Sequence, residues 1–175
     1  MTDLTLTRRV LGLAPESIRK SRFLIIGYGN ELRKDDAVGP LVAEAVANWQ
    51  MPSIRSLSVL HLTENLVHDI AGTDYAIFVT ACSGSSCART LQIDPIEQGS
   101  RMFEALAVKD IHTCNPRTLL DLSQQRYGRE PQAWFLQVPV ESVAEGEGLS
   151  STAQQGGDHA VRIIGQFLKT YQSLT

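Results

Sequence analysis

Residues 23–49 read FLIIGYGNELRKDDAVGPLVAEAVANW and decide the fold of this chain. Residues 23–26 form an unbroken apolar run that ends at Gly27, a pattern typical of a strand buried on both faces in a parallel sheet. Apolar residues then recur at helical spacing from Val38 to Trp49, and the predicted helix ends before Pro52. A buried strand, a short loop and an amphipathic helix together indicate the first unit of an α/β protein.

The same alternation continues along the chain. We expect further strands at residues 56–62, 75–80, 90–93 and 134–138, and further helices at residues 64–70, 116–127 and 158–171. Asp158 follows two glycines, and we expect it to cap the last helix. This order predicts the α/β class, as a three-layer α/β/α sandwich around a mixed, mostly parallel sheet. We interpret residues 1–21 as an N-terminal lead-in and residues 22–175 as a single domain.

The composition narrows the classes of function. The 175 residues carry a formal net charge of -3, with 16 Lys and Arg interspersed among 19 Asp and Glu, which argues against a protein that coats nucleic acid. No run approaches the roughly 18 apolar residues of a membrane span, and the first residues lack the apolar core of a signal peptide, so we expect a cytoplasmic protein. In that reducing compartment we expect Cys82, Cys87 and Cys114 to remain thiols.

The predicted sheet also indicates where a ligand would bind. In open α/β sheets, ligands bind outside the carboxyl ends of the strands. Residues 27–36, 80–87 and 139–147 leave those ends, and residues 112–115, just before a helix, are placed to converge on the same edge. We therefore expect the functional site at these loops.

The loop after the first strand allows three interpretations. Its glycines could let backbone amides approach a phosphate, but the third glycine of the dinucleotide fingerprint is missing and two aspartates would repel the anion. Asp35 or Asp36 could instead cap the helix that follows. Together with Asn30 and Glu31, the two carboxylates could also bind a hard or borderline cation.

Cysteine and histidine residues allow two weaker hypotheses. Cys82, Cys87, Cys114 and His112 could form a zinc site of three thiolates and one imidazole, although small polar turns often contain such residues without metal. A Cys114 nucleophile with His112 as its base would need a sharp turn, because the two residues are only two positions apart.

The motif Gly27-Tyr28-Gly29-Asn30, followed by Asp35-Asp36-Ala37-Val38-Gly39-Pro40, resembles the opening signature of the hydrogenase maturation proteases, G-x-G-N and then D-D/E-x-x-G. Other segments resemble family segments in the same order: Leu62-Thr63-Glu64, Phe78-Val79-Thr80-Ala81, His112-Thr113-Cys114-Asn115-Pro116 and Glu145-Gly146-Glu147-Gly148-Leu149-Ser150. The resemblance covers about residues 22–165 and implies a phosphorylase/hydrolase-like fold.

The resemblance implies an endopeptidase that removes the C-terminal extension from the large-subunit precursor of a nickel-iron hydrogenase. Nickel carried by that precursor would be the recognition element, as a transient part of the substrate. Asp36 matches the family's acidic metal ligand, and His112 is the implied imidazole ligand, which makes these two the candidate catalytic residues. A metal held between protease and substrate can position one peptide bond and polarise its carbonyl or a water. No nucleic acid or membrane partner is implied.

Two positions depart from the family pattern. Thr80, the third implied metal ligand, stands where the family has the Asp of V-D-A, and Asn115 stands where many relatives have Asp. A hydroxyl and an amide are weaker metal ligands than carboxylates. An alternative is therefore a catalytically impaired homologue that acts as a protein-binding or maturation accessory factor. The remaining residues implied to line the substrate loops are Gly27, Gly29, Asn30, Asp35 and Glu141.

Overall fold

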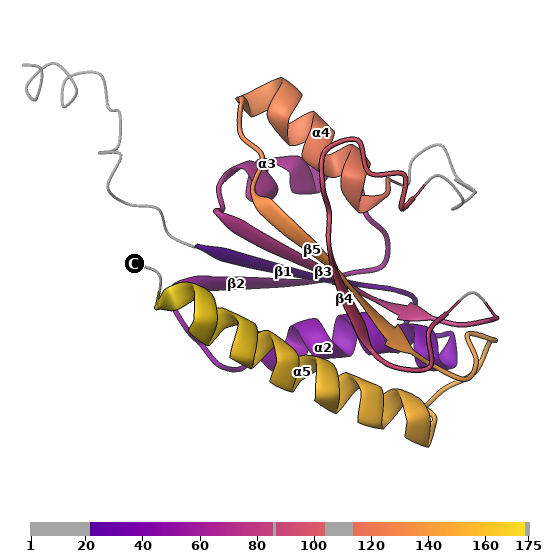
Figure 1. Cartoon of the computed structure of the whole chain (residues 1–175). Coiled ribbons are helices and arrows are strands. Elements are labelled where there is room, and N and C mark those ends of the chain that lie inside the picture. Colours follow the sequence, from indigo (N-terminus) through magenta and orange to yellow (C-terminus); the bar gives the residue numbers. More distant parts are fainter. Residues whose placement is uncertain (1–21, 86, 104–113, 174–175) are drawn as a thin grey trace, which may run out of the picture.

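The computed structural model describes residues 22–85, 87–103 and 114–173. Its elements are β1 (Phe23–Tyr28), the 3-10 turn η1 (Lys34–Ala37), α2 (Val38–Ala47), β2 (Ile54–Val59), η2 (Glu64–Leu66), α3 (Val67–Ala71), β3 (Tyr75–Cys82), β4 (Gln92–Pro95), α4 (Pro116–Tyr127), β5 (Gln132–Pro139) and α5 (Ser151–Gln172). The strands form a sheet in the order β2-β1-β3-β5-β4. All neighbouring strands are parallel except β4, which pairs antiparallel with β5 (Figure 1).

Helices cover both faces of this sheet. α2 and α5 pack on one face, and η2, α3 and α4 pack on the other (Figure 1). Alternate β1 side chains enter the two cores: Ile25 faces α2 and α5, whereas Leu24 and Ile26 face α3 and α4. All three are at most 1% exposed, as expected for a central strand covered on both sides. The predicted three-layer α/β/α sandwich is confirmed.

The strands and helices fall near their predicted positions, with one clear error. The helix at 116–127 has the predicted bounds, and the strands differ from the predicted ranges by a few residues at their ends. The last helix, however, starts seven residues earlier than predicted, at Ser151, and its cap is Ser150, whose side chain accepts a hydrogen bond from the Ala153 amide. Asp158 therefore lies inside α5 and does not cap it.

Two glycines allow β1, β3 and α2 to approach each other closely. A Cβ at Gly27 would lie 2.0 Å from the Gly39 carbonyl oxygen, and a Cβ at Gly39 would lie 2.5 Å from the Tyr28 carbonyl oxygen and 2.7 Å from that of Val79. No larger residue fits at either position without moving the backbone. This contact places the start of α2, and the loop before it, directly over the carboxyl ends of the two central strands.

Within the described ranges, no helix combines the length and the hydropathy that a membrane crossing requires.

The contact between β1 and α2 can be tested with one substitution. We expect Gly27→Ala to lower the free energy of unfolding by about 3 kcal/mol, because the added methyl group strikes backbone on α2. Gly165→Ala is the matched control, since its Cβ would meet only Trp49 at an ordinary 3.6 Å, and alanine in a helix is favoured by up to about 1 kcal/mol. Urea unfolding measures both. Equal stability of the two variants would contradict the close approach.

Candidate functional site

Asp35 connects the first loop to two distant segments. Its side chain is 1% exposed and accepts four hydrogen bonds, three from backbone amides and one from a hydroxyl. The amides of Glu141 and Ser142 donate to Oδ2 at 3.0 and 3.1 Å. Ser150 donates its amide to Oδ1 at 2.7 Å and its hydroxyl to Oδ2 at 2.8 Å. One buried carboxylate thus joins the first loop, the loop after β5 and the cap of α5.

These donors also decide the ionisation of Asp35. Burial alone would raise the pKa of the carboxyl group, but the hydrogen bonds from Ser150, Ser142 and Glu141 favour the charged form and hold its pKa below the ordinary 3.8. The expectation that Asp35 or Asp36 caps α2 is wrong. Both residues lie in η1, and no side chain caps the amide groups at the start of α2.

Asp36 is held at the carboxyl edge of the sheet by the glycine motif. The Asn30 amide donates to Asp36 Oδ2 at 2.7 Å, and the Asn30 side chain accepts from the Leu32 amide at 2.9 Å, which closes the turn. Gly29 has φ of +151°, and a Cβ there would lie 2.1 Å from the Asp36 carbonyl oxygen. Gly29 and Asn30 therefore position the carboxylate of Asp36, which remains partly exposed.

Thr80 lies beside Tyr28 at the end of the two central strands. Its hydroxyl donates to the Tyr28 carbonyl oxygen at 3.1 Å. The sequence did not single out Tyr28, whose phenol also lies in this region. Burial raises its pKa above the ordinary 10, with the Thr80 side chain as hydrogen-bond partner and the negative charge of Asp36 acting in the same upward direction as burial. Tyr28, Thr80 and Asp36 therefore lie close together.

The cysteines differ from the expectation. Cys82 and Cys87 form a disulfide, with Cα atoms 5.8 Å apart, whereas only Cys114 is a free thiol. A bonded pair cannot supply two thiolates, so the structure contradicts both the three-thiol expectation and the zinc site built on it. The two cysteines are five positions apart in sequence, a spacing that alone does not establish that their sulfur atoms meet.

Asn115 and Cys114 have local structural roles. Asn115 Oδ1 accepts from the Thr118 amide at 2.9 Å, which makes Asn115 the cap of α4. The Cys114 amide donates to the Leu62 carbonyl oxygen at 2.8 Å. Burial, followed by the charge of Glu64, raises the pKa of the Cys114 thiol, which disfavours a thiolate nucleophile. His112 lies outside the described residues.

The other implied site residues divide between the first loop and the loop after β5. Glu141 is exposed, and its carboxylate accepts a hydrogen bond from the Thr152 hydroxyl on α5, while its backbone amide donates to Asp35. Glu31 is exposed on the turn after Asn30. Among the residues described, no group of three or more His, Cys, Asp and Glu side chains is arranged to hold a metal. Asp36 is thus the implied metal ligand that the structure places near Tyr28, which in turn contacts Thr80.

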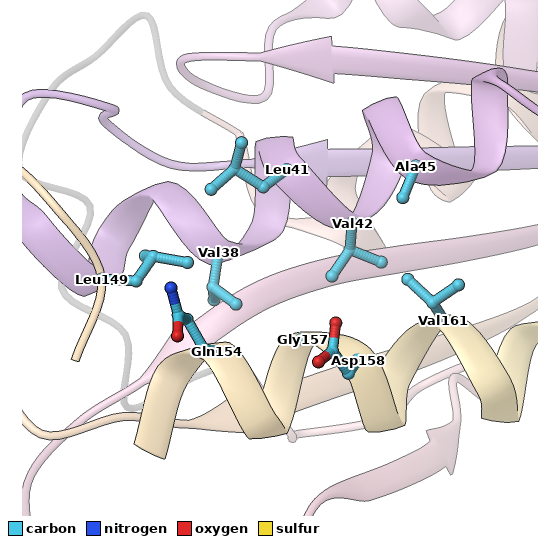
Figure 2. A pocket seen from close by; sticks show the side chains of 9 residues that line it. All are labelled: Val38, Leu41, Val42, Ala45, Leu149, Gln154, Gly157, Asp158 and Val161. Atoms are coloured by element: carbon cyan, nitrogen blue, oxygen red, sulfur yellow. The ribbon is translucent and has the colours of Figure 1, made fainter. Parts of the chain in front are cut away.

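A cavity of about 390 Å³ lies between α2 and α5, on the face of the sheet that these two helices cover. Figure 2 shows Val38 and Val42 pointing from α2 toward α5, and Gln154, Asp158 and Val161 pointing back from α5. Its lining is mostly aliphatic and contains neither Asp36 nor Thr80. We therefore assign the candidate site to the edge formed by Tyr28, Thr80 and Asp36.

The hydrogen bonds of Asp35 predict how the free energy of unfolding depends on pH. Asp35→Asn should lower the free energy of unfolding at pH 7 by about 2–4 kcal/mol, because an amide cannot accept all four hydrogen bonds. The native carboxylate has a lowered pKa, so it contributes stability above the unfolded pKa of about 4 and loses it as the pH falls through the native value. Denaturant unfolding from pH 7 to pH 2 should therefore show the variant and the parent converging. Exposed Asp158→Asn is the control, and a constant difference at every pH would contradict this role.

Alkylation tests the disulfide. Denatured in guanidinium without reductant, the protein should take up one iodoacetamide group, at Cys114, and after reduction it should take up three. Intact-mass measurement gives the count, and Cys87→Ser, which frees the Cys82 thiol, should raise the unreduced count to two. Three groups without reductant would show that the Cys82–Cys87 bond is absent.

No protein-family model matches the chain, and no curated protein matches it.

Several solved structures have the same fold. The hydrogenase maturating endopeptidase HybD from E. coli is 22% identical, with a TM-score of 0.64 over 86% of this chain and 93% of its own. The [NiFe] hydrogenase maturation protease HycI from Thermococcus kodakarensis KOD1 is 23% identical, with a TM-score of 0.64 over 86% of this chain and 94% of its own. The hydrogenase 2 maturation peptidase from Thaumarchaeota archaeon SCGC_AB-539-E09 is 19% identical, with a TM-score of 0.61 over 85% and 98%. The chain therefore has the fold of the hydrogenase maturation proteases.

Proposed function

We propose that this protein is an endopeptidase of hydrogenase maturation. Its substrate would be the large-subunit precursor of a nickel-iron hydrogenase, from which it removes a C-terminal extension in the cytoplasm. The observation that carries the proposal is the position of Asp36, held by Gly29 and Asn30 at the carboxyl edge of a sheet with the maturation-protease fold.

The geometry of Asp36 suits a ligand to a metal that arrives with the substrate. One oxygen is held by the Asn30 amide, and within the described part of the chain no group donates to the other oxygen, Oδ1. A carboxylate fixed at one oxygen can offer the second to a cation without losing its orientation. The precursor's nickel would thereby align one peptide bond with the site and polarise its carbonyl or an attacking water. The proposed site also includes Thr80 and His112.

A second candidate is a maturation accessory factor that binds the precursor without cutting it. The neutral Thr80 hydroxyl, at a position where the family pattern has a carboxylate, supports this candidate. A site with one carboxylate binds a divalent cation more weakly than a site with two. The two candidates share the same partner and differ in whether a peptide bond is broken.

The cleavage experiment uses a nickel-loaded large-subunit precursor and, as control, the same precursor without nickel. We expect the parent protein to shorten only the loaded precursor, and Asp36→Asn to lower the rate at least about 100-fold because the anionic ligand is lost. Glu31→Gln is the matched control, since Glu31 is an exposed acid of the same loop. Intact-mass measurement of the precursor follows the reaction.

Nickel calorimetry on the free protein separates the two candidates. Binding by the parent that Asp36→Asn removes supports the endopeptidase. The accessory factor is supported if the parent neither binds nickel nor changes the precursor mass while Thr80→Asp gains a nickel site. Cleavage of the nickel-free precursor at the same rate would contradict nickel guidance.

A further inference from the structure

Three uncharged polar side chains lie side by side across the carboxyl edge of the sheet. Thr80 on β3 pairs directly with Gln137 on β5. Tyr28 on β1 is level with Thr80, because Gly27 and Val79 are paired one position earlier. Residues level with each other on parallel strands point to the same face. Tyr28, Thr80 and Gln137 therefore form one row, which we call the neutral row.

The neutral row is the first polar layer above the core. One step down the strands, on the same face, Ile26, Phe78 and Phe135 are paired in the same way and are 0%, 0% and 3% exposed. The three members of the neutral row are each partly exposed. The face thus changes from sealed and apolar to accessible and polar within two residues of each strand.

Hydrogen bonds to Tyr28 and to the neighbouring Cys82 hold side chains of the neutral row in place without adding charge. The Thr80 hydroxyl donates to the Tyr28 carbonyl oxygen at 3.1 Å, and the Gln137 amide nitrogen lies 3.7 Å from Cys82 Sγ. The phenol of Tyr28 is uncharged at neutral pH even at its ordinary pKa of 10, and burial raises that pKa further. The nearby charge is that of Asp36, beside the Tyr28 end of the row.

We propose that the neutral row is a binding subsite for the backbone of an extended polypeptide segment. The inference rests on the proposed function, in which that segment is the cleavage region of the precursor. The Tyr28 phenol and the Gln137 amide can each donate to carbonyl groups and accept from amide groups of a peptide. The Thr80 hydroxyl, whose hydrogen goes to the Tyr28 carbonyl oxygen, can accept from a peptide amide. The row itself contains no carboxylate or imidazole to hold a cation and no Lys or Arg to hold a free anion. Thr80 is shared with the proposed nickel site, whose anionic and imidazole ligands, Asp36 and His112, are not members of the row.

The length of the neutral row matches such a segment. Neighbouring strands are about 4.8 Å apart, so a row across β1, β3 and β5 spans about 10 Å. An extended chain advances about 3.3 Å per residue, so about three residues cover the row. A peptide lying across the three strand ends would bring one of its bonds to the Asp36 end.

The binding experiment uses a synthetic peptide that spans the cleavage junction of a large-subunit precursor, with both ends blocked. We expect Tyr28→Phe and Gln137→Leu each to raise the Kd by about three- to tenfold, since each removes one or two hydrogen bonds. Tyr127→Phe, which alters an exposed phenol at the end of α4, is the control. Thermal unfolding verifies that each variant is folded. Because the contacts are to backbone, N-methylation of the junction amides should weaken binding more than alanine substitution of the junction side chains.

Each result has a defined meaning. An unchanged Kd in both variants, or no binding of the peptide by the parent, overturns the neutral row as a peptide subsite. The same holds if N-methylation has no effect. If binding depends on the row but the nickel-loaded precursor is not shortened, the subsite stands and the proposed cleavage fails. If cleavage occurs with the same KM in parent and variants, the cleavage stands and the subsite fails.

Discussion

The buried carboxylate of Asp35 is the constraint on which the candidate site depends. Its four hydrogen bonds reach residues more than 100 positions away in sequence, and they join the first loop to both ends of the loop between β5 and α5. Asp36 is the next residue, so its position is inherited from this network together with Gly29 and Asn30. A displacement of Asp35 would therefore change both the fold of the loop after β5 and the direction of the neighbouring carboxylate.

The two faces of the sheet differ at the carboxyl ends of the strands, where one stays apolar and the other becomes polar. The face under α2 and α5 contains the aliphatic cavity of Figure 2 and continues as an apolar core to the ends of the strands. The face under α3 and α4 ends in polar groups instead, and one of them, Tyr28, lies near Asp36. The close backbone contact at Gly27 and Gly39 brings the first loop over this edge, so fold and site are products of the same packing.

The strong periodic patterns in the sequence predicted the sheet and most helices correctly, because burial on one or both faces leaves a local trace in residue order. The predicted start of α5 was wrong because two consecutive glycines, Gly156 and Gly157, are typical of a helix boundary. In the structure they are inside the helix, where a Cβ would lie 2.7 Å from Val138 Cγ1 and 3.2 Å from Val38 Cγ2 respectively. Their small size lets α5 pack closely against β5 and α2. This requirement comes from the tertiary structure, so the local sequence does not reveal it.

The site was predictable only in part. The glycine motif and the aspartates indicated the correct loop, but the partners of Asp35 come from distant segments, and the neutral row exists only through the register of three strands. The single available signal for Tyr28 was its place at the end of a buried strand, level with the end of the next. The pairing of Cys82 with Cys87 likewise depends on the distance between the two residues in space, which their spacing in the sequence does not supply.

The order of the strands also bears on how copies of this protein could associate. At one end of the sheet, β4 is only four residues long and ends at Pro95. The Ile96 amide points inward to the Ala133 carbonyl oxygen, so the nitrogen of Pro95, which carries no hydrogen, faces the open side. A strand from another molecule would find an interrupted row of donors there. Of the two edge strands described, β2 is therefore the one more open to pairing with a strand from another molecule.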